Sequence, residues 1–84
     1  MDTFMRAAID EALKAVHKHD GGPFGAVVVK DGVIVGRGHN QVVSSHDPTA
    51  HAEVMALRDA SKTLGRFDLS DCVRHVSPPH GMPF

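Results

Sequence analysis

A histidine and a glutamate two residues apart are the clearest candidates for chemistry in this 84-residue chain. They are His51 and Glu53, within the run Pro-Thr-Ala-His-Ala-Glu at positions 48–53. An imidazole can bind a metal ion, and a carboxylate can move protons as a general acid and base. Side chains two positions apart on a helix point to roughly opposite sides, which argues against both of them binding one metal ion. On its own, the tripeptide could also be a chance one, with Glu53 an ordinary first-turn anion.

Both residues fall in the first turn of a predicted helix. Asp47 suits the capping position and Pro48 the first helical position, so we expect the helix to run from about Pro48 to Leu64. Gly65 is a suitable stop. The backbone N–H groups of a first turn have no partner within the helix and favour negative charge nearby. The expected buried side of this second helix comprises Ala50, Val54, Leu57, Ala60 and Leu64.

The preceding residues predict a helix and a β-hairpin. Helical spacing of apolar residues predicts a first helix over residues 4–17, and the glycines and proline of residues 20–23 end it. Valine-rich runs at residues 24–30 and 33–38 predict two strands, and Asp31-Gly32 between them predicts a type I′ turn. The first run is continuously apolar, which indicates a strand covered on both faces. The expected buried side of the first helix comprises Met5, Ile9, Ala12, Leu13 and Val16.

The remaining pattern predicts an α/β sandwich of two helices and three strands. Gly36 and Gly38 indicate close backbone packing or a bulge in the second strand, and residues 39–47 read as a polar loop. Residues 72–76 predict a short third strand. A right-handed crossover through the second helix would make this strand parallel to its neighbour. At least one edge of such a sheet stays unpaired.

Length and charge limit the classes of function. A chain of 84 residues makes one small domain or a piece of a larger one, and it buries only about 60–65% of its unfolded surface. Nine basic and ten acidic residues give a formal net charge of −1, which argues against binding to nucleic acid. The longest apolar run, residues 25–29, is too short to span a membrane, and residues 1–6 lack the pattern of a signal peptide. We therefore expect a cytoplasmic protein in which the single cysteine, Cys72, is a free thiol.

Two stretches resemble a known family. Residues 47–58, Asp-Pro-Thr-Ala-His-Ala-Glu-Val-Met-Ala-Leu-Arg, resemble the first zinc motif of the cytidine deaminase-like superfamily, which includes the CMP/dCMP deaminase zinc-binding proteins. This motif is similar in guanine deaminases and in tRNA adenosine deaminases. Residues 21–32, Gly-Gly-Pro-Phe-Gly-Ala-Val-Val-Val-Lys-Asp-Gly, look more like bacterial guanine deaminases. The resemblance covers roughly residues 4–77.

The resemblance implies roles for five residues. It implies a three-layer α/β/α sandwich in which His51 binds Zn²⁺ and Glu53 is the general acid and base. Zinc lowers the pKa of its bound water to about 7, which suits hydrolysis. Asn40 would hydrogen-bond the base, and Phe24 and Ala52 would line the substrate pocket. From the residues alone, Asn40 could equally be a turn residue and Phe24 ordinary core.

The implied function is a zinc-dependent hydrolysis of a purine base, guanine giving xanthine and ammonia. The implied partners are a small-molecule purine base and a second copy of the chain in a homodimer, with no membrane and no nucleic acid. Two alternatives stay open. One is a non-catalytic fragment of a deaminase fold that dimerises or binds a base, and the other is a tRNA adenosine deaminase-like protein.

The chain departs from the family after residue 77. The family continues with Pro-Cys-x-x-Cys, whose two thiolates bind zinc, but Gly81 and Phe84 stand at the corresponding positions. We therefore expect residues 1–77 to be the N-terminal part of a deaminase domain and residues 78–84 to be an atypical proline-rich tail. A tail read out of frame, a truncated chain and a site rebuilt with His80 remain as explanations. Without the thiolates, catalysis by this chain alone is in doubt.

Overall fold

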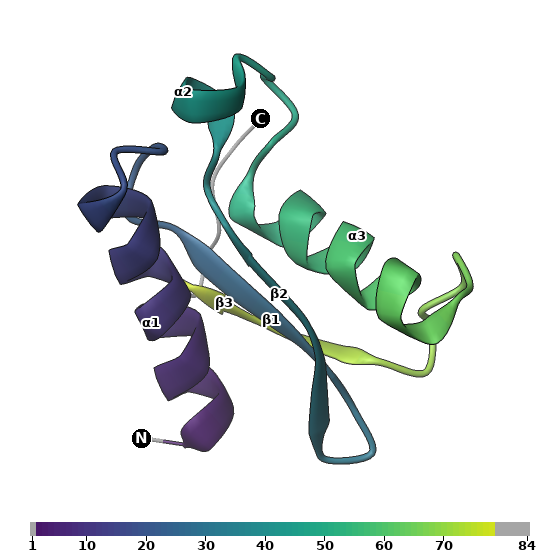
Figure 1. Ribbon diagram of the computed structural model, residues 1–84. Coiled ribbons are helices and arrows are strands. Elements are labelled where there is room, and N and C mark those ends of the chain that lie inside the picture. Colours follow the sequence, from purple (N-terminus) through teal and green to yellow (C-terminus); the bar gives the residue numbers. More distant parts are fainter. Residues whose placement is uncertain (1, 79–84) are drawn as a thin grey trace.

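The computed structural model describes residues 2–78 and places a three-stranded sheet between two helical layers (Figure 1). The elements are α1 (Thr3–His17), β1 (Gly25–Lys30), β2 (Val33–His39), α2 (Val42–Ser45), α3 (Ala52–Leu64) and β3 (Val73–Ser77). Helix α1 covers one face of the sheet and α3 covers the other. This α/β/α arrangement confirms the predicted order of helix, hairpin, helix and strand.

Strand β1 lies in the middle of the sheet, whose strand order is β2-β1-β3. Ala26 and Val28 pack into the core beneath α3, whereas Val27 and Val29 pack with Ala7 of α1. Alternate side chains of one strand therefore fill both cores. The prediction of a strand covered on both faces is confirmed.

The β1–β2 hairpin has the predicted two-residue turn. Lys30 pairs with Val33, and the two residues between them, Asp31 and Gly32, have φ angles of 51° and 76°. A type I′ turn requires positive φ at both positions, and its twist matches that of the strands. The two residues Asp31 and Gly32 predicted this turn by themselves, and the structure has it at these positions.

Glycines in β2 allow α3 to approach the sheet closely. A Cβ atom on Gly36 would lie 2.5 Å from the carbonyl oxygen of Ala56, and one on Gly38 would lie 2.3 Å from the amide nitrogen of Ala56. A register shift in the β1–β2 ladder also leaves Val35 as an extra residue in β2. The predicted close packing is therefore present at Gly36 and Gly38, and a bulge lies just before them at Val35.

The predicted direction of the third strand is wrong. Strand β3 pairs with β1, and the two are antiparallel. Because β1 is the middle strand, the connection from β2 through α3 passes over β1 and reaches its far side. Strand β3 thus runs parallel to β2, to which it is not hydrogen-bonded, and antiparallel to its actual neighbour.

The predicted start of the second long helix is also wrong. Helix α3 begins at Ala52 with His51 as its N-cap, four residues after Pro48. The carboxylate of Asp47 accepts hydrogen bonds from the amide and the hydroxyl of Thr49, at 2.9 and 2.7 Å. This Asx turn uses the oxygen that would have capped a helix. The short helix α2 also lies within the segment predicted to be a polar loop.

The helices bury alanines rather than their larger apolar residues. Leu13 and Val16, predicted to be buried, are 48% and 44% exposed. Small side chains let the helix backbones lie close to the sheet glycines, and a Cβ atom on Gly25 would lie 2.2 Å from the carbonyl oxygen of Ala8. The buried residues of the two long helices are Ala7, Ala8, Glu11, Ala12 and Ala15 of α1, and Ala52, Ala56 and Ala60 of α3. Among the described residues, no helix is long and apolar enough to cross a membrane.

Candidate functional site

The N-terminal end of α3 holds the predicted chemical pair. His51 caps the helix with an extended backbone, and its carbonyl oxygen accepts the first helical hydrogen bond, from the amide of Met55 at 2.9 Å. The Nδ1 atom of His51 is buried. Glu53 lies in the first turn, with its side chain 30% exposed. A half-buried imidazole beside an accessible carboxylate can serve as a ligand next to a proton carrier.

Glu53 already has a cationic partner in this structure. The guanidinium of Arg74, on β3, forms an ion pair and hydrogen bond with the Glu53 carboxylate. Residues at alternate positions of a strand share one face, and Val76 packs into the core beneath α3. Arg74 therefore lies on the face of the sheet that α3 covers. The alternation of the third strand could have suggested this contact, but only once its pairing partner was known.

A backbone link joins this helix end to Asn40. The amide of Gln41 donates to the carbonyl oxygen of Ala50 at 2.9 Å, so the residues after β2 lie beside the residues before α3. Asn40 is buried, its amide donates to the carbonyl oxygen of Phe24 at 3.1 Å, and its Oδ1 accepts from the amide of Val42 at 2.9 Å. The last contact is the turn role considered from sequence. A role in hydrogen-bonding a base stays a prediction.

Gly21, in the loop after α1, lies against Asn40. A Cβ atom on Gly21 would lie 2.3 Å from Oδ1 of Asn40, so only glycine permits this approach. Phe24 packs partly buried against the core cluster that contains Ala52, on the α3 side of the sheet. The fold thus gathers all five residues predicted to form the site at one end of the sheet. Their chemical roles remain predictions.

The described residues do not form a metal site by themselves. Among residues 2–78, no three histidine, cysteine, aspartate or glutamate side chains gather closely enough to hold a metal ion. The ring of His75 packs against Phe4 of α1, on the other face of the sheet, with ring centroids 5.4 Å apart. Cys72 is a free thiol beside Asp71, at the end of β3 away from Ser77, and burial raises its pKa. Neither is placed to join His51.

The remaining candidate zinc ligands of the chain are in the tail after residue 78. Gly81 and Phe84, which occupy the positions of the family's thiolates, and His80 all lie outside the described residues. The residues that are described offer zinc one imidazole and one neighbouring carboxylate, and that carboxylate is ion-paired to Arg74. This donor set does not fit a tetrahedral zinc site, which needs at least three protein ligands.

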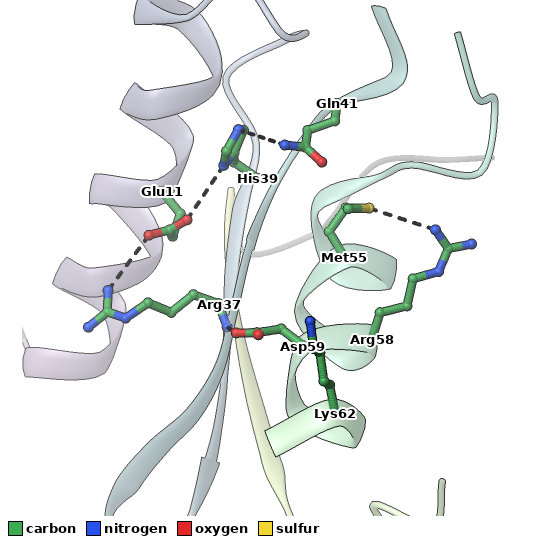
Figure 2. A pocket seen from close by; sticks show the side chains of 8 residues that line it. All are labelled: Glu11, Arg37, His39, Gln41, Met55, Arg58, Asp59 and Lys62. Atoms are coloured by element: carbon green, nitrogen blue, oxygen red, sulfur yellow. Dashed lines mark hydrogen bonds and ion pairs between the residues drawn. The ribbon is translucent and has the colours of Figure 1, made fainter. Parts of the chain in front are cut away.

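A separate cavity of about 390 Å³ lies along the outer edge of β2, between α1 and α3 (Figure 2). Asp59 of α3 covers part of that edge, because its carboxylate accepts from the amide of Arg37 at 2.8 Å. None of the five predicted site residues lines this cavity. Its lining residues are Glu11, Arg37, His39, Gln41, Met55, Arg58, Asp59 and Lys62.

Comparison with known proteins supplies the family. The model of the cytidine and deoxycytidylate deaminase zinc-binding region matches residues 1–78. This chain belongs to that family. It is 51% identical over 76 residues to the guanine deaminase of Bacillus subtilis (strain 168), which covers 90% of this chain and 49% of that protein. It is 39% identical over 74 residues to a tRNA-specific adenosine deaminase of Aquifex aeolicus (strain VF5), which covers 88% of this chain and 48% of that one.

Solved structures of deaminases share the fold. The X-ray structure of the Bacillus subtilis guanine deaminase has a TM-score of 0.85 at 51% identity, covering 92% of this chain and 50% of that one. A guanine deaminase from Nitrosomonas europaea has a TM-score of 0.79 at 31% identity, covering 88% and 44% of the two chains. The predicted cytidine deaminase-like fold is therefore confirmed. The chain spans about half the length of the curated relatives it matches.

Proposed function

We propose that this chain carries the N-terminal half of a purine-base deaminase site, with guanine as the substrate and zinc as the metal. The observation that supports this most is the hydrogen bond from Gln41 to Ala50, because it brings the Asn40 segment to the end of α3 that carries His51 and Glu53. The greatest similarity among the relatives described above is to a guanine deaminase.

Each residue has a role in this proposal. Asn40 and Phe24 hold and enclose the base, with Ala52 in the pocket wall. Glu53 takes one proton from the attacking water and passes it to a ring nitrogen. It then moves the second proton, from the added hydroxyl, to the amino group, which leaves as ammonia while the carbonyl forms. His51 supplies one metal ligand, and a bound zinc ion would supply an acidified water. The other metal ligands would have to come from outside residues 2–78, so this half of the site binds the base, carries the proton and contributes a single imidazole.

The proposal also covers the oligomeric state, the cellular location and the metabolic role of the protein. We propose a homodimer in the cytoplasm that acts in purine metabolism on a free base. Editing of adenosine in tRNA is the competing activity, since tRNA-specific adenosine deaminases are among the relatives. A formal net charge of −1 favours the small base, because binding to a polyanionic tRNA gains from a surplus of basic side chains.

Zinc and base binding by the purified chain test the proposal. We expect weak zinc binding in a chelator competition, weakened at least tenfold further by His51→Ala. The matched control His17→Ala, at an exposed histidine of α1, should leave zinc affinity unchanged. Guanine should bind more tightly than adenosine or an RNA anticodon stem-loop.

The same measurements separate the alternatives. Ammonia release from guanine would establish turnover by the chain itself, whereas base binding without ammonia release would indicate a non-catalytic module. Zinc affinity that His51→Ala leaves unchanged, together with absence of guanine binding, would contradict the proposal.

A further inference from the structure

A set of largely enclosed ionisable side chains lies next to Asn40 and has no role in the proposed function. The set comprises Glu11 of α1, Asp20 of the loop after α1, and His39 at the end of β2. Their side chains are 4%, 14% and 11% exposed. His39 bridges the two carboxylates, with Nε2 at 2.7 Å from Oδ2 of Asp20 and Nδ1 at 3.6 Å from Oε1 of Glu11. Figure 2 shows that His39 and Glu11 face one another, and both line the cavity along the edge of β2.

Ion pairs and hydrogen bonds compensate for the burial of the Glu11 and Asp20 carboxylates. Buried carboxylates are destabilising unless they are paired and hydrogen-bonded. Glu11 also contacts the ammonium of Lys14 at 2.8 Å and the guanidinium of Arg37 at 3.7 Å. The hydrogen bond from His39 lowers the pKa of Asp20 below its usual value. A carboxylate can only accept a hydrogen bond, so the His39 Nε2–H is the donor in its 2.7 Å contact with Asp20.

Asp20 connects this set to the residues around Asn40. Its carboxylate binds His39, while its backbone carbonyl oxygen accepts from the amides of Val43 and Ser44 at 3.0 and 3.1 Å. Those amides belong to α2. Asn40 lies in the chain between His39 and α2, so both ends of its segment are tied to one residue.

We propose that His39 is a positioning residue that fixes residues 20–24 against residues 40–44 and so sets how the Asn40 side chain meets a base. The part concerning the base rests on the proposed function. The part concerning the two segments rests only on the contacts above. A leucine could fill the space of His39 but could not donate to Asp20, whereas a glutamine keeps an N–H donor.

Amide hydrogen exchange tests the positioning claim without any ligand. The probes are the amides of Asn40, Val43 and Ser44, which bond across the two segments, and the reference is the amide of Met55 in α3. We expect His39→Leu to speed exchange at the three probes at least tenfold while the reference keeps its rate. His39→Gln should stay within about threefold of the unchanged chain. Equal protection in His39→Leu, or equal loss in both variants, would overturn the proposal.

A second variant keeps the test decisive if His39→Leu does not fold. Asp20→Ala keeps the backbone carbonyl but removes the side-chain oxygen that accepts from His39. It should speed exchange at the same three amides and leave the α3 reference unchanged. Unchanged exchange at the three amides of a folded Asp20→Ala chain would also overturn the proposal.

Guanine affinity then separates this inference from the proposed function. We expect His39→Leu to weaken guanine binding at least tenfold, with His39→Gln restoring most of it and His17→Leu as the control. If guanine binds neither the unchanged chain nor the variants, while exchange follows the expected pattern, the proposed function fails and the positioning role stands. If guanine binds His39→Leu as tightly as the unchanged chain, the role of His39 in the base subsite is refuted.

Discussion

In this structure, which holds no substrate or metal, the Glu53 carboxylate is ion-paired with the guanidinium of Arg74. The Arg74 guanidinium that binds it is 59% exposed, so the pair is a surface ion pair worth at most about 1 kcal/mol to stability. Its effect on chemistry is larger than its effect on folding, because the cation lies beside the carboxylate that would carry protons. The same cation also repels a metal ion approaching His51.

Replacing Arg74 should therefore change metal binding more than folding. We expect Arg74→Leu to raise the affinity of the chain for zinc about three- to tenfold in a chelator competition. The free energy of unfolding should change by less than about 1 kcal/mol. Arg6→Leu, which removes the same charge from an exposed position of α1 on the opposite face of the sheet, is the matched control. Equal zinc affinity in both variants would show that the ion pair does not influence the site.

The proposed site residues were predicted from sequence because their motifs are local. His51 and Glu53 form one tripeptide, and Asn40 and Phe24 flank the two strands of one hairpin. Arg74 could not be found in this way, because its contact with Glu53 depends on which side of β1 the third strand occupies. The buried Glu11 was equally hard to predict, since two of its partners, Arg37 and His39, lie on β2, far from α1 in the sequence.

At the scale of elements, the seating of α3 on β2 depends on glycine. Gly38→Ala would place a methyl group 2.3 Å from the amide nitrogen of Ala56 and 2.6 Å from the carbonyl oxygen of Ala52. Because both atoms belong to a helix backbone, the helix must move. We expect a loss of about 2–3 kcal/mol in urea unfolding. The control Gly32→Asn removes a glycine with φ of 76° and open space around it, and should cost less than about 1 kcal/mol.

The Asp20–His39 bond gives a pH dependence with a defined sign. The pKa of Asp20 is lowered in the folded chain, chiefly by the hydrogen bond from His39. Its stabilising contribution is therefore complete above the unfolded pKa of about 3.9 and is lost as pH falls through the lower folded value. The stability difference between the unchanged chain and Asp20→Asn should be constant from pH 5 to 6 and shrink toward pH 2.5 in urea titrations. In a His39→Leu background, most of that pH dependence should disappear.

The helices, strands and turns were predicted correctly where neighbouring residues in the sequence determine them. The Asp31-Gly32 turn and the buried character of β1 followed from neighbouring residues. The start of α3 did not, because Asp47 forms its own turn with Thr49 instead of capping a helix. The buried faces of the helices were predicted only in part: Ala12 and Ala60 are buried as predicted, whereas Leu13 and Val16 are exposed. Close approach to the sheet glycines favours alanine over larger side chains.

At the scale of the molecule, the chain spans about half the length of the relatives that it matches. The described residues include a three-stranded sheet, a long helix on each of its faces and the residues proposed for proton transfer and base binding. The described residues supply too few ligands for zinc. The central claim is therefore that residues 1–77 form a competent N-terminal half of a guanine deaminase site.

Guanine deamination by a chimera tests this claim most directly. Residues 1–77 of this chain would replace the matching half of the Bacillus subtilis guanine deaminase, with which the chain shares 51% identity over 76 residues. We expect a folded, zinc-loaded chimera that releases ammonia from guanine, and an activity loss of at least a thousandfold on Glu53→Gln. A folded, zinc-loaded chimera without activity, or one whose activity survives Glu53→Gln, would contradict the account.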